Sequence, residues 1–355
     1  MRYQFLPPGN SIFALVFCAF VPVTFALAAP VAKQPPVVKP GLSKGPDCIR
    51  PACGDGIRLL KFPSDKNYGA LLVLPFFNRN EAVQANAVLN ARGTVSVPRN
   101  KFVIFKPGEN FFRKPSVIDS FAPDSFDGID IRFLSMADDE DLLCDQALNH
   151  IARLTGLKVL EVDRSDVTDA GMSALSKLTN LEYISAFLTQ IEGHCLKDLV
   201  GLQKLQSLSI TSVGLKNETL QYLPKLGSLC DLELSRAGLN DEGVKYIGQC
   251  VKLTRLRIAR NPHITSASAK YLANLKQLDT LDLREAGISA KALEALKGLK
   301  LKLFFAPMSS PSPADRELVQ KIFPGTSVMY PGKGKENVDE ETNTIFGQMS
   351  RGRKL

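Results

Sequence analysis

The chain has 355 residues, of which 45% are hydrophobic, and its formal net charge is +8. That hydrophobic content suits a packed protein and excludes disorder along the whole chain. Most of the positive charge lies outside the central region. Residues 29–66 carry a net charge of +4, Arg2 adds +1, and residues 331–355 add another +1, which leaves +2 for residues 67–330. A nucleic-acid-binding domain carries its excess of Lys and Arg on the fold itself, so we expect no nucleic-acid partner.

An apolar segment lies near the N-terminus, where residues 11–29 contain no charge and follow Arg2. Ala26 and Ala28 supply the small side chains of a signal-peptide cleavage site. We therefore predict a signal peptide over residues 1–28 and a mature chain that is exported, whether secreted, periplasmic or in the cell envelope. The alternative is an uncleaved anchor, which would attach the protein to a membrane.

Two segments have the composition of chain outside a core. Residues 29–66 are rich in Pro and Lys, which predicts an extended linker. Residues 331–355 are polar, mixed in charge and aperiodic, which predicts a disordered tail. Within the linker, Cys48 and Cys53 are close enough in sequence for a disulfide that closes a small loop, as an exported protein permits.

An internal repeat dominates the middle of the chain. Equivalent apolar positions recur every 24 residues, and once after 25, at Leu160, Ile184, Leu208, Leu232, Leu256 and Leu281. Each unit begins with the pattern LxxLxL, whose alternation predicts a strand with one buried face. A turn and a stretch with helical spacing of apolar residues follow. One unit cannot bury its own apolar side, so the units are expected to stack.

The repeat resembles the leucine-rich-repeat family. Residues 168–172 (Thr-Asp-Ala-Gly-Met) and 240–244 (Asn-Asp-Glu-Gly-Val) match the T-D-x-G-L turn of the ribonuclease-inhibitor-like type, which also occurs in exported bacterial proteins. The resemblance covers residues 126–305. It implies an α/β solenoid, a horseshoe with parallel strands on the concave face and true helices on the convex face. It implies no particular function, because architecture alone defines the family.

The ends of the array depart from the repeat, as solenoid caps do. We predict an N-terminal capping region over residues 67–125, with a helix in 80–91 and short strands at 94–97 and 101–106. A strand at 128–133 and a helix near 138–153 precede the first regular repeat. A last strand at 299–305 and a helix at 314–322 close a solenoid that spans residues 126–330.

The sequence carries no standard catalytic signature. It lacks the patterns G-x-S-x-G, H-E-x-x-H and C-x-x-C, and it has no Walker A loop. Cys250 falls in a column of leucines and is expected to be buried, while Cys195 occupies the column of Gly171 and Gly243. We therefore predict that the protein is not an enzyme and has no catalytic residue, metal ligand or cofactor.

The strand residues that alternate with the buried ones are expected to point to the concave face. They form three rows across the sheet. The first row is Val159, Tyr183, Ser207, Asp231, Arg255 and Thr280. The second row is Glu161, Ser185, Ser209, Glu233, Arg257 and Asp282. The third row is Asp163, Phe187, Thr211, Ser235, Ala259 and Arg284.

Two features of these rows suggest a binding surface, and each has a structural alternative. Two aromatic side chains could anchor a partner or pack against local loops. Opposite charges side by side could bind a partner or form a ladder of ion pairs that stabilises the sheet. Our hypothesis is that a protein or peptide docks over the aromatic pair and extends toward Arg255 and Arg257. The candidate contacts are Tyr183, Phe187, Ser185, Ser209, Thr211, Asp231, Glu233, Arg255, Arg257, Asp282 and Arg284.

The predicted function is therefore a non-catalytic protein-binding module that acts outside the cytoplasm. The alternative is a structural component of the cell envelope or of an extracellular assembly, in which the linker would matter most and the array would be a spacer.

Overall fold

The computed structural model describes residues 47–51, 54–79, 83–133, 143–212 and 214–331. The chain divides into two units, Met1–Ser43 and Lys44–Leu355, and every described residue belongs to the second. The predicted signal peptide, Cys53 and residues 332–355 lie outside the described residues, so the predictions on them stay predictions. Across the described ranges, no helix combines the length and apolar character needed to cross a membrane.

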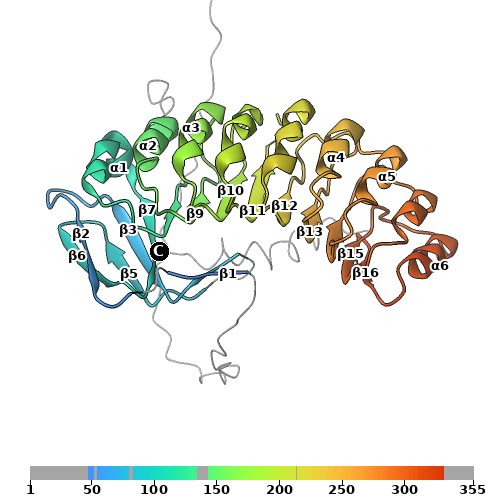
Figure 1. The fold of residues 1–355 in the computed structure, drawn as a ribbon, viewed down its shortest axis with the longest axis horizontal. Coiled ribbons are helices and arrows are strands. Elements are labelled where there is room, and N and C mark those ends of the chain that lie inside the picture. The colour runs from blue at the N-terminus through green and yellow to red at the C-terminus, as the bar shows by residue number, and fades with distance from the viewer. Residues whose placement is uncertain (1–46, 52–53, 80–82, 134–142, 213, 332–355) are drawn as a thin grey trace, which may run out of the picture. The chain divides into compact units, whose positions relative to one another are not determined.

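A 12-stranded sheet runs through the second unit, and strands β7 to β16 within it are all parallel (Figure 1). These strands are β7 (Phe102–Pro107), β8 (Gly128–Asp130), β9 (Val159–Glu161), β10 (Tyr183–Phe187), β11 (Ser207–Thr211), β12 (Asp231–Glu233), β13 (Arg255–Arg257), β14 (Thr280–Asp282), β15 (Leu303–Phe305) and β16 (Ser327–Met329). The repeat positions from Leu160 to Leu281 pair directly across neighbouring strands, as the repeat predicted.

The parallel array extends beyond the predicted range at its N-terminal end, and at the other end it adds strand β16 inside the predicted C-terminal cap. Ile104 in β7 pairs with Gly128 in β8, and Leu303 in β15 pairs with Ser327 in β16. Within each pair, the two residues are one repeat length of 24 residues apart in sequence. The array therefore begins one strand earlier than residue 126, inside the region predicted to be the cap.

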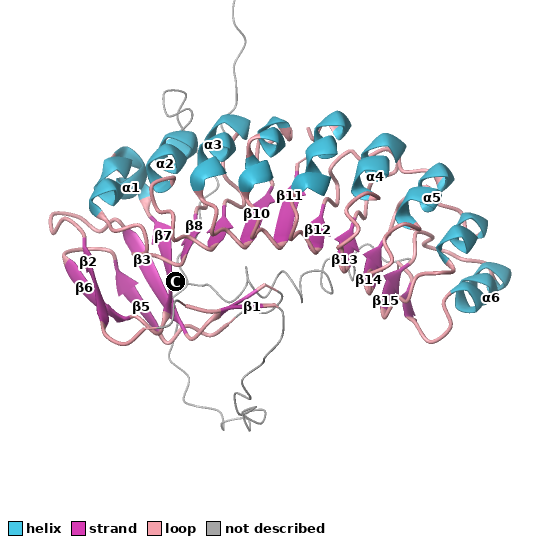
Figure 2. Ribbon diagram, in the orientation of Figure 1, coloured by secondary structure: helices cyan, strands magenta, loops and turns pink. Residues whose placement is uncertain are grey.

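Short helical segments cover the opposite face of the sheet (Figure 2). The α-helices are α1 (Glu109–Arg113), α2 (Leu143–Ile151), α3 (Asp169–Ser173), α4 (Asp241–Ile247), α5 (Ala269–Leu272) and α6 (Pro313–Ile322). The 3₁₀ segments are η1 (Pro115–Ser120), η2 (Ala174–Lys177), η3 (His194–Lys197), η4 (Leu199–Gly201), η5 (Asn217–Lys225), η6 (Ser266–Ser268) and η7 (Lys291–Leu296). The expectation of a true helix in every repeat is therefore wrong.

An α-helix opens the convex segment in the two repeats that keep the turn glycine. A Cβ on Gly171 would lie 2.2 Å from Oδ1 of Asp145, and one on Gly243 would lie 2.2 Å from Oδ1 of Asn217. Each of these oxygens comes from the preceding repeat and accepts a backbone N–H of the turn, from Thr168 and from Asn240 respectively. The glycine is thus required because a neighbouring polar side chain occupies the place of its Cβ.

The main core lies between the sheet and the helical segments and is built from the repeated leucines and isoleucines. Cys195 and Cys250 are both buried in it, as their alignment predicted. Burial raises the pKa of the Cys250 thiol to about 12, and that of Cys195 is raised as well. Both thiols therefore serve as small apolar side chains.

The region predicted to be the N-terminal cap, joined by the end of the predicted linker, is built mainly of strands, and we continue to call it the cap. Its strands are β1 (Cys48–Ile49), β2 (Ile57–Lys61), β3 (Gly69–Leu74), β4 (Phe77–Asn78), β5 (Ala87–Asn90) and β6 (Thr94–Pro98). Strand β3 pairs antiparallel with β5 and β7, while β2 pairs with β6 and β1 pairs with β4. The strands predicted at 94–97 and 101–106 are confirmed.

Two sequence predictions for the cap are wrong. No helix forms in the described part of residues 80–91, because residues 87–90 pair with β3 as strand β5, and pairing outweighs the helix propensity of this Ala-rich segment. The linker predicted to reach residue 66 is also shorter, because β1 and β2 lie within it and pair with β4 and β6.

Candidate functional site

A two-stranded ribbon lies on the concave side of the sheet. It consists of residues 47–51, which include β1, and residues 75–79, which include β4, and we call it the strap. Cys48 pairs with Asn78 and Ile49 pairs with Phe77 in antiparallel register. Figures 1 and 2 show β1 on the side of the sheet away from the helices.

The base of the strap is held by a second apolar cluster. Ile49, Phe77 and Tyr183 are 3%, 6% and 4% exposed, and they pack with side chains of β3, β7 and β9. The ring centroids of Phe77 and Tyr183 are 5.2 Å apart. Burial raises the pKa of Tyr183 well above its ordinary value. The prediction of Tyr183 as an exposed anchor is therefore wrong, because the strap covers it.

The tip of the strap reaches β13. The carboxylate of Asp47 forms an ion pair with Arg255, 208 residues away in sequence, and lies 3.6 Å from Nη2 of Arg79. Arg255 also donates to Asp231 at 3.0 Å. Burial by itself lowers the pKa of the Arg255 guanidinium, but these two carboxylates outweigh burial and raise it. Arg255, predicted to meet a partner, is thus bound by the chain itself.

The predicted ladder of ion pairs is present. Arg257 pairs with Glu233, and its Nη2 lies 2.9 Å from Oδ1 of Asp231. Burial raises the pKa of Glu233, although Arg257 opposes that shift. In the next strand Asp282 pairs with Arg284 at 2.6 Å. These charges are thus paired within the sheet, which is the arrangement that the structural alternative expects.

Ser185 in the second row is also bound by a neighbouring repeat. Ser185 donates to Asp163 at 2.7 Å, and the backbone N–H of Phe187 donates to the same carboxylate oxygen at 2.9 Å. Ser185 and Thr211 are buried, whereas Ser209 is partly exposed. Burial raises the pKa of Asp163 despite these hydrogen bonds.

The turn that follows each strand forms the rim of the concave face. Five of its residues adopt a left-handed conformation, with φ between 54° and 58°, at Arg164, Leu188, Arg236, Arg260 and Glu285. This conformation costs a non-glycine residue about 1–2 kcal/mol. These positions recur at the repeat spacing, one residue after the third row, and that recurrence is the sequence signal that could have identified them.

One part of the rim is apolar, exposed and next to a cation. Leu188 is 51% exposed, and the half-buried ring of Phe187 lies 6.0 Å from the guanidinium carbon of Arg164. We call these three residues the rim patch. Of the two aromatics predicted as anchors, only Phe187 lies in it, while Leu188 and Arg164 were missed.

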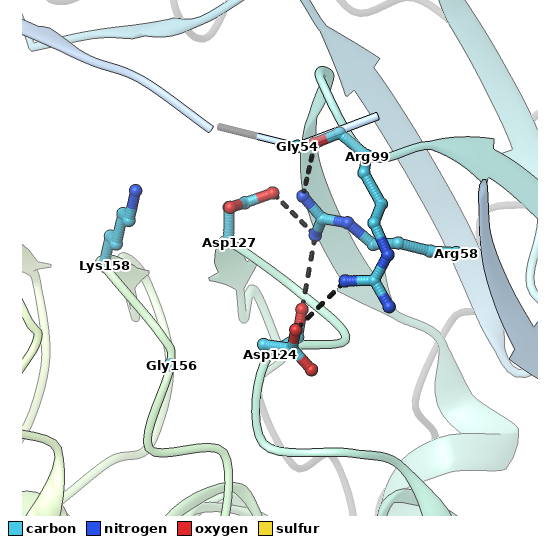
Figure 3. A pocket seen from close by; sticks show the side chains of 7 residues that line it. All are labelled: Gly54, Arg58, Arg99, Asp124, Asp127, Gly156 and Lys158. Atoms are coloured by element: carbon cyan, nitrogen blue, oxygen red, sulfur yellow. Dashed lines mark hydrogen bonds and ion pairs between the residues drawn. The ribbon is translucent and has the colours of Figure 1, made fainter. Parts of the chain in front are cut away.

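A small cavity lies where the cap meets the first repeats (Figure 3). Its volume is about 60 Å³, enough for a few waters and too small for an organic ligand. Arg58, which is buried, forms an ion pair of 2.8 Å with Asp127 and donates to Arg99 O and Lys101 O. Exposed Arg99 pairs with Asp124 across the opening. The arrangement joins the cap to the array.

The described ranges also contain no group of three or more His, Cys, Asp or Glu side chains placed to hold a metal ion.

The chain has only a weak likeness to known proteins. No protein-family model matches the chain, and no curated protein matches it significantly. Among solved structures, an internalin from Listeria monocytogenes is 19% identical, with a TM-score of 0.43 over 60% of this chain and 63% of its own. The ectodomain of the receptor kinase GASSHO1/SCHENGEN3 from Arabidopsis thaliana, in complex with CASPARIAN STRIP INTEGRITY FACTOR 2, is 14% identical, with a TM-score of 0.37 over 58% of this chain and 24% of its own.

A TDR receptor is 16% identical, with a TM-score of 0.39 over 64% of this chain and 41% of its own. The chain thus spans less than two thirds of the length of each of these structures. The fold rests on the chain's own repeat register and parallel ladder, and it is a leucine-rich-repeat α/β solenoid of horseshoe form.

Proposed function

We propose that this chain is a non-catalytic protein-binding module that acts outside the cytoplasm and holds a protein or peptide at the rim of its concave face. The observation that carries the proposal is the rim patch, in which Leu188 is 51% exposed beside Phe187 and Arg164. The left-handed turn recurs along the rim, but among its five residues only Leu188 is a large apolar side chain that is exposed, and exposed apolar side chains beside an aromatic ring suit a docking surface. The predicted signal peptide supports action outside the cytoplasm.

The strap covers the part of the concave face where the sequence predicted the contact, so we propose a contact at a different position. Tyr183 lies under the strap, and Arg255 and Arg257 are 20% and 13% exposed and already paired. A partner that approaches the rim patch meets the turns of the following repeats next. The proposed contact therefore follows the rim from Leu188 toward Arg236.

The test is a measured affinity in a matched pair of variants. A stoichiometric partner is first isolated from envelope extract by cross-linking and identified, and its Kd is then measured by calorimetry. Replacing Phe187→Ala and Leu188→Asn together should cost about 2 kcal/mol or more, which is about a 30-fold weaker Kd. Asn is chosen because it tolerates the left-handed turn.

The control variant is Val251→Asn, which changes another large apolar residue that is 56% exposed. It lies after α4, away from the rim, and should leave the Kd unchanged. Equal affinities of the parent and the double variant would show that the rim patch is not the docking surface. Sedimentation of the chain with bulk wall material, without a discrete partner, would favour the structural alternative.

A further inference from the structure

The strap presents to the concave face the two kinds of side chain that a bound peptide would offer. Ile49 fills an apolar place beside Phe77, and Asp47 gives its carboxylate to Arg255. The backbone of β1 pairs antiparallel with β4. The β1 segment therefore occupies the concave face in the manner of a ligand that belongs to the chain itself.

We propose that β1 is an exchangeable strand. An extended segment of a partner protein, with an acidic residue two positions before an aliphatic one, takes the place of β1 against β4. Its carboxylate replaces that of Asp47 on Arg255. This inference rests on the proposed function, since it names the partner's chemistry and the regulation of the same face.

The pairing of the strands shows why β1, and not β4, is the strand that leaves. Strand β4 follows β3 after two residues, and β3 is held between β5 and β7 in the large sheet. Among the described strands, β1 pairs with β4 alone. The β1 segment is held by Ile49 in the apolar cluster, by the Asp47 ion pair with Arg255 and by a hydrogen bond from Lys158 to Arg50 O at 2.6 Å.

The charges around the tip select an acidic segment. Asp47 contacts both Arg79 and Arg255, while Asp231 is shared between Arg255 and Arg257. Removing the Asp47 carboxylate takes one anionic partner from Arg255 and from Arg79, while Asp231 and Glu233 stay paired with Arg255 and Arg257. An arriving carboxylate replaces that partner, and an arriving cation does not. Because these groups are partly buried, the charge selection is only weakly screened by salt.

Competition with β1 regulates the exchange. A strand tethered to its own site has a high effective concentration, on the order of millimolar for a short flexible tether. A partner must displace it, and its apparent affinity falls by the fraction of molecules in which the site is open. Weakening β1 should therefore increase binding of an outside strand.

The experiment uses the full chain and a fluorescent peptide that copies residues 44–51, with Ser in place of Cys48. Binding is measured by anisotropy for the parent and for the Asp47→Asn variant. We expect the variant to bind the peptide at least tenfold more tightly than the parent. The same peptide carrying Asp47→Asn should bind neither protein. The control protein is Asp55→Asn, the same change at an exposed aspartate, and it should behave as the parent.

Hydrogen exchange supplies a second measurement that does not depend on the peptide. The N–H of Arg79 donates to Asp47 O at 3.1 Å, so its exchange reports on the strap. Asp47→Asn should accelerate exchange at this amide, and the peptide should restore protection. Arg255→Gln should accelerate it as well, but the peptide should not bind, because its carboxylate has lost the guanidinium.

Equal peptide affinity in the parent and Asp47→Asn, or unchanged exchange at Arg79, would overturn the proposal and make the strap a fixed part of the fold. Such a failure is distinct from failure of the proposed function. Phe187 and Leu188 do not belong to the cluster that holds Ile49, so the affinity test at the rim patch keeps its meaning.

Discussion

Replacing Tyr183→Ala tests whether the strap covers the concave face. On an open face this change would cost little, because surface substitutions usually change the free energy of unfolding by less than about 0.5 kcal/mol. In the structure Tyr183 is 4% exposed and packs against Phe77 at 5.2 Å. Truncating a buried aromatic side chain to Ala costs about 3–5 kcal/mol. Because this cluster is small, we expect the lower end of that range, about 3 kcal/mol.

The measurement is urea unfolding followed by far-UV circular dichroism, with the midpoint and slope fitted together. Phe187→Ala is the matched control, since it removes an aromatic ring from the same strand and the same face where the ring is only half-buried. It should cost clearly less than Tyr183→Ala.

A double-mutant cycle with Phe77→Ala isolates the ring contact. The coupling energy between Phe77 and Tyr183 should be about 1 kcal/mol, as for other aromatic pairs. If Tyr183→Ala costs no more than Phe187→Ala and the coupling is zero, the strap does not cover β10 and the account of the concave face is wrong.

Three further predictions concern the array and its junction with the cap. Gly243→Ala should destabilise the protein by about 1–2 kcal/mol in the urea assay, because the new Cβ displaces a hydrogen-bonded amide oxygen. The control is Gly201→Ala, whose Cβ would have no atom closer than 4.0 Å and which should be neutral or stabilising. Arg58→Ala should cost about 3–5 kcal/mol, since it leaves a buried carboxylate unpaired, and thermal unfolding should show a much smaller loss for exposed Arg99→Ala. Burial raises the pKa of Asp241, but hydrogen bonds from two neighbouring side chains outweigh burial and lower that pKa below its value in the unfolded chain. The stability that the ionised Asp241 contributes is therefore present at neutral pH and lost as the pH falls. Asp241→Asn should thus be less stable than the parent at pH 7 and differ little from it near pH 2.

Most of the fold could be predicted from the repeat in the sequence. The spacing of Leu160, Ile184 and Leu208 predicted which residues pair across the strands, because a parallel ladder between identical units has one register that keeps every leucine buried. In the repeat with the extra residue, Pro262 and His263 form a turn. The prediction of the register depended on contacts between neighbouring repeats.

The strap could not be predicted in this way. Asp47 lies in a segment whose Pro and Lys content suggests a linker, and its partner Arg255 is 208 residues away with no repeated spacing to connect them. The prediction that Tyr183 is exposed was wrong for the same reason, because the residue that covers it, Phe77, comes from the cap and not from a neighbouring repeat. The short 3₁₀ segments were missed because the spacing of apolar residues does not distinguish them from α-helices.

The contact between Asp47 and Arg255 also has a mechanical consequence. In a solenoid each repeat contacts its neighbours alone, so bending is resisted by each interface separately. The strap adds a chord across the arc, anchored at β10 by Phe77 and at β13 by Asp47. Straightening the array between these points would pull on the ion pair and the ring contact at once. The strands from β14 to β16 lie beyond the chord, so contacts between neighbouring repeats set their curvature.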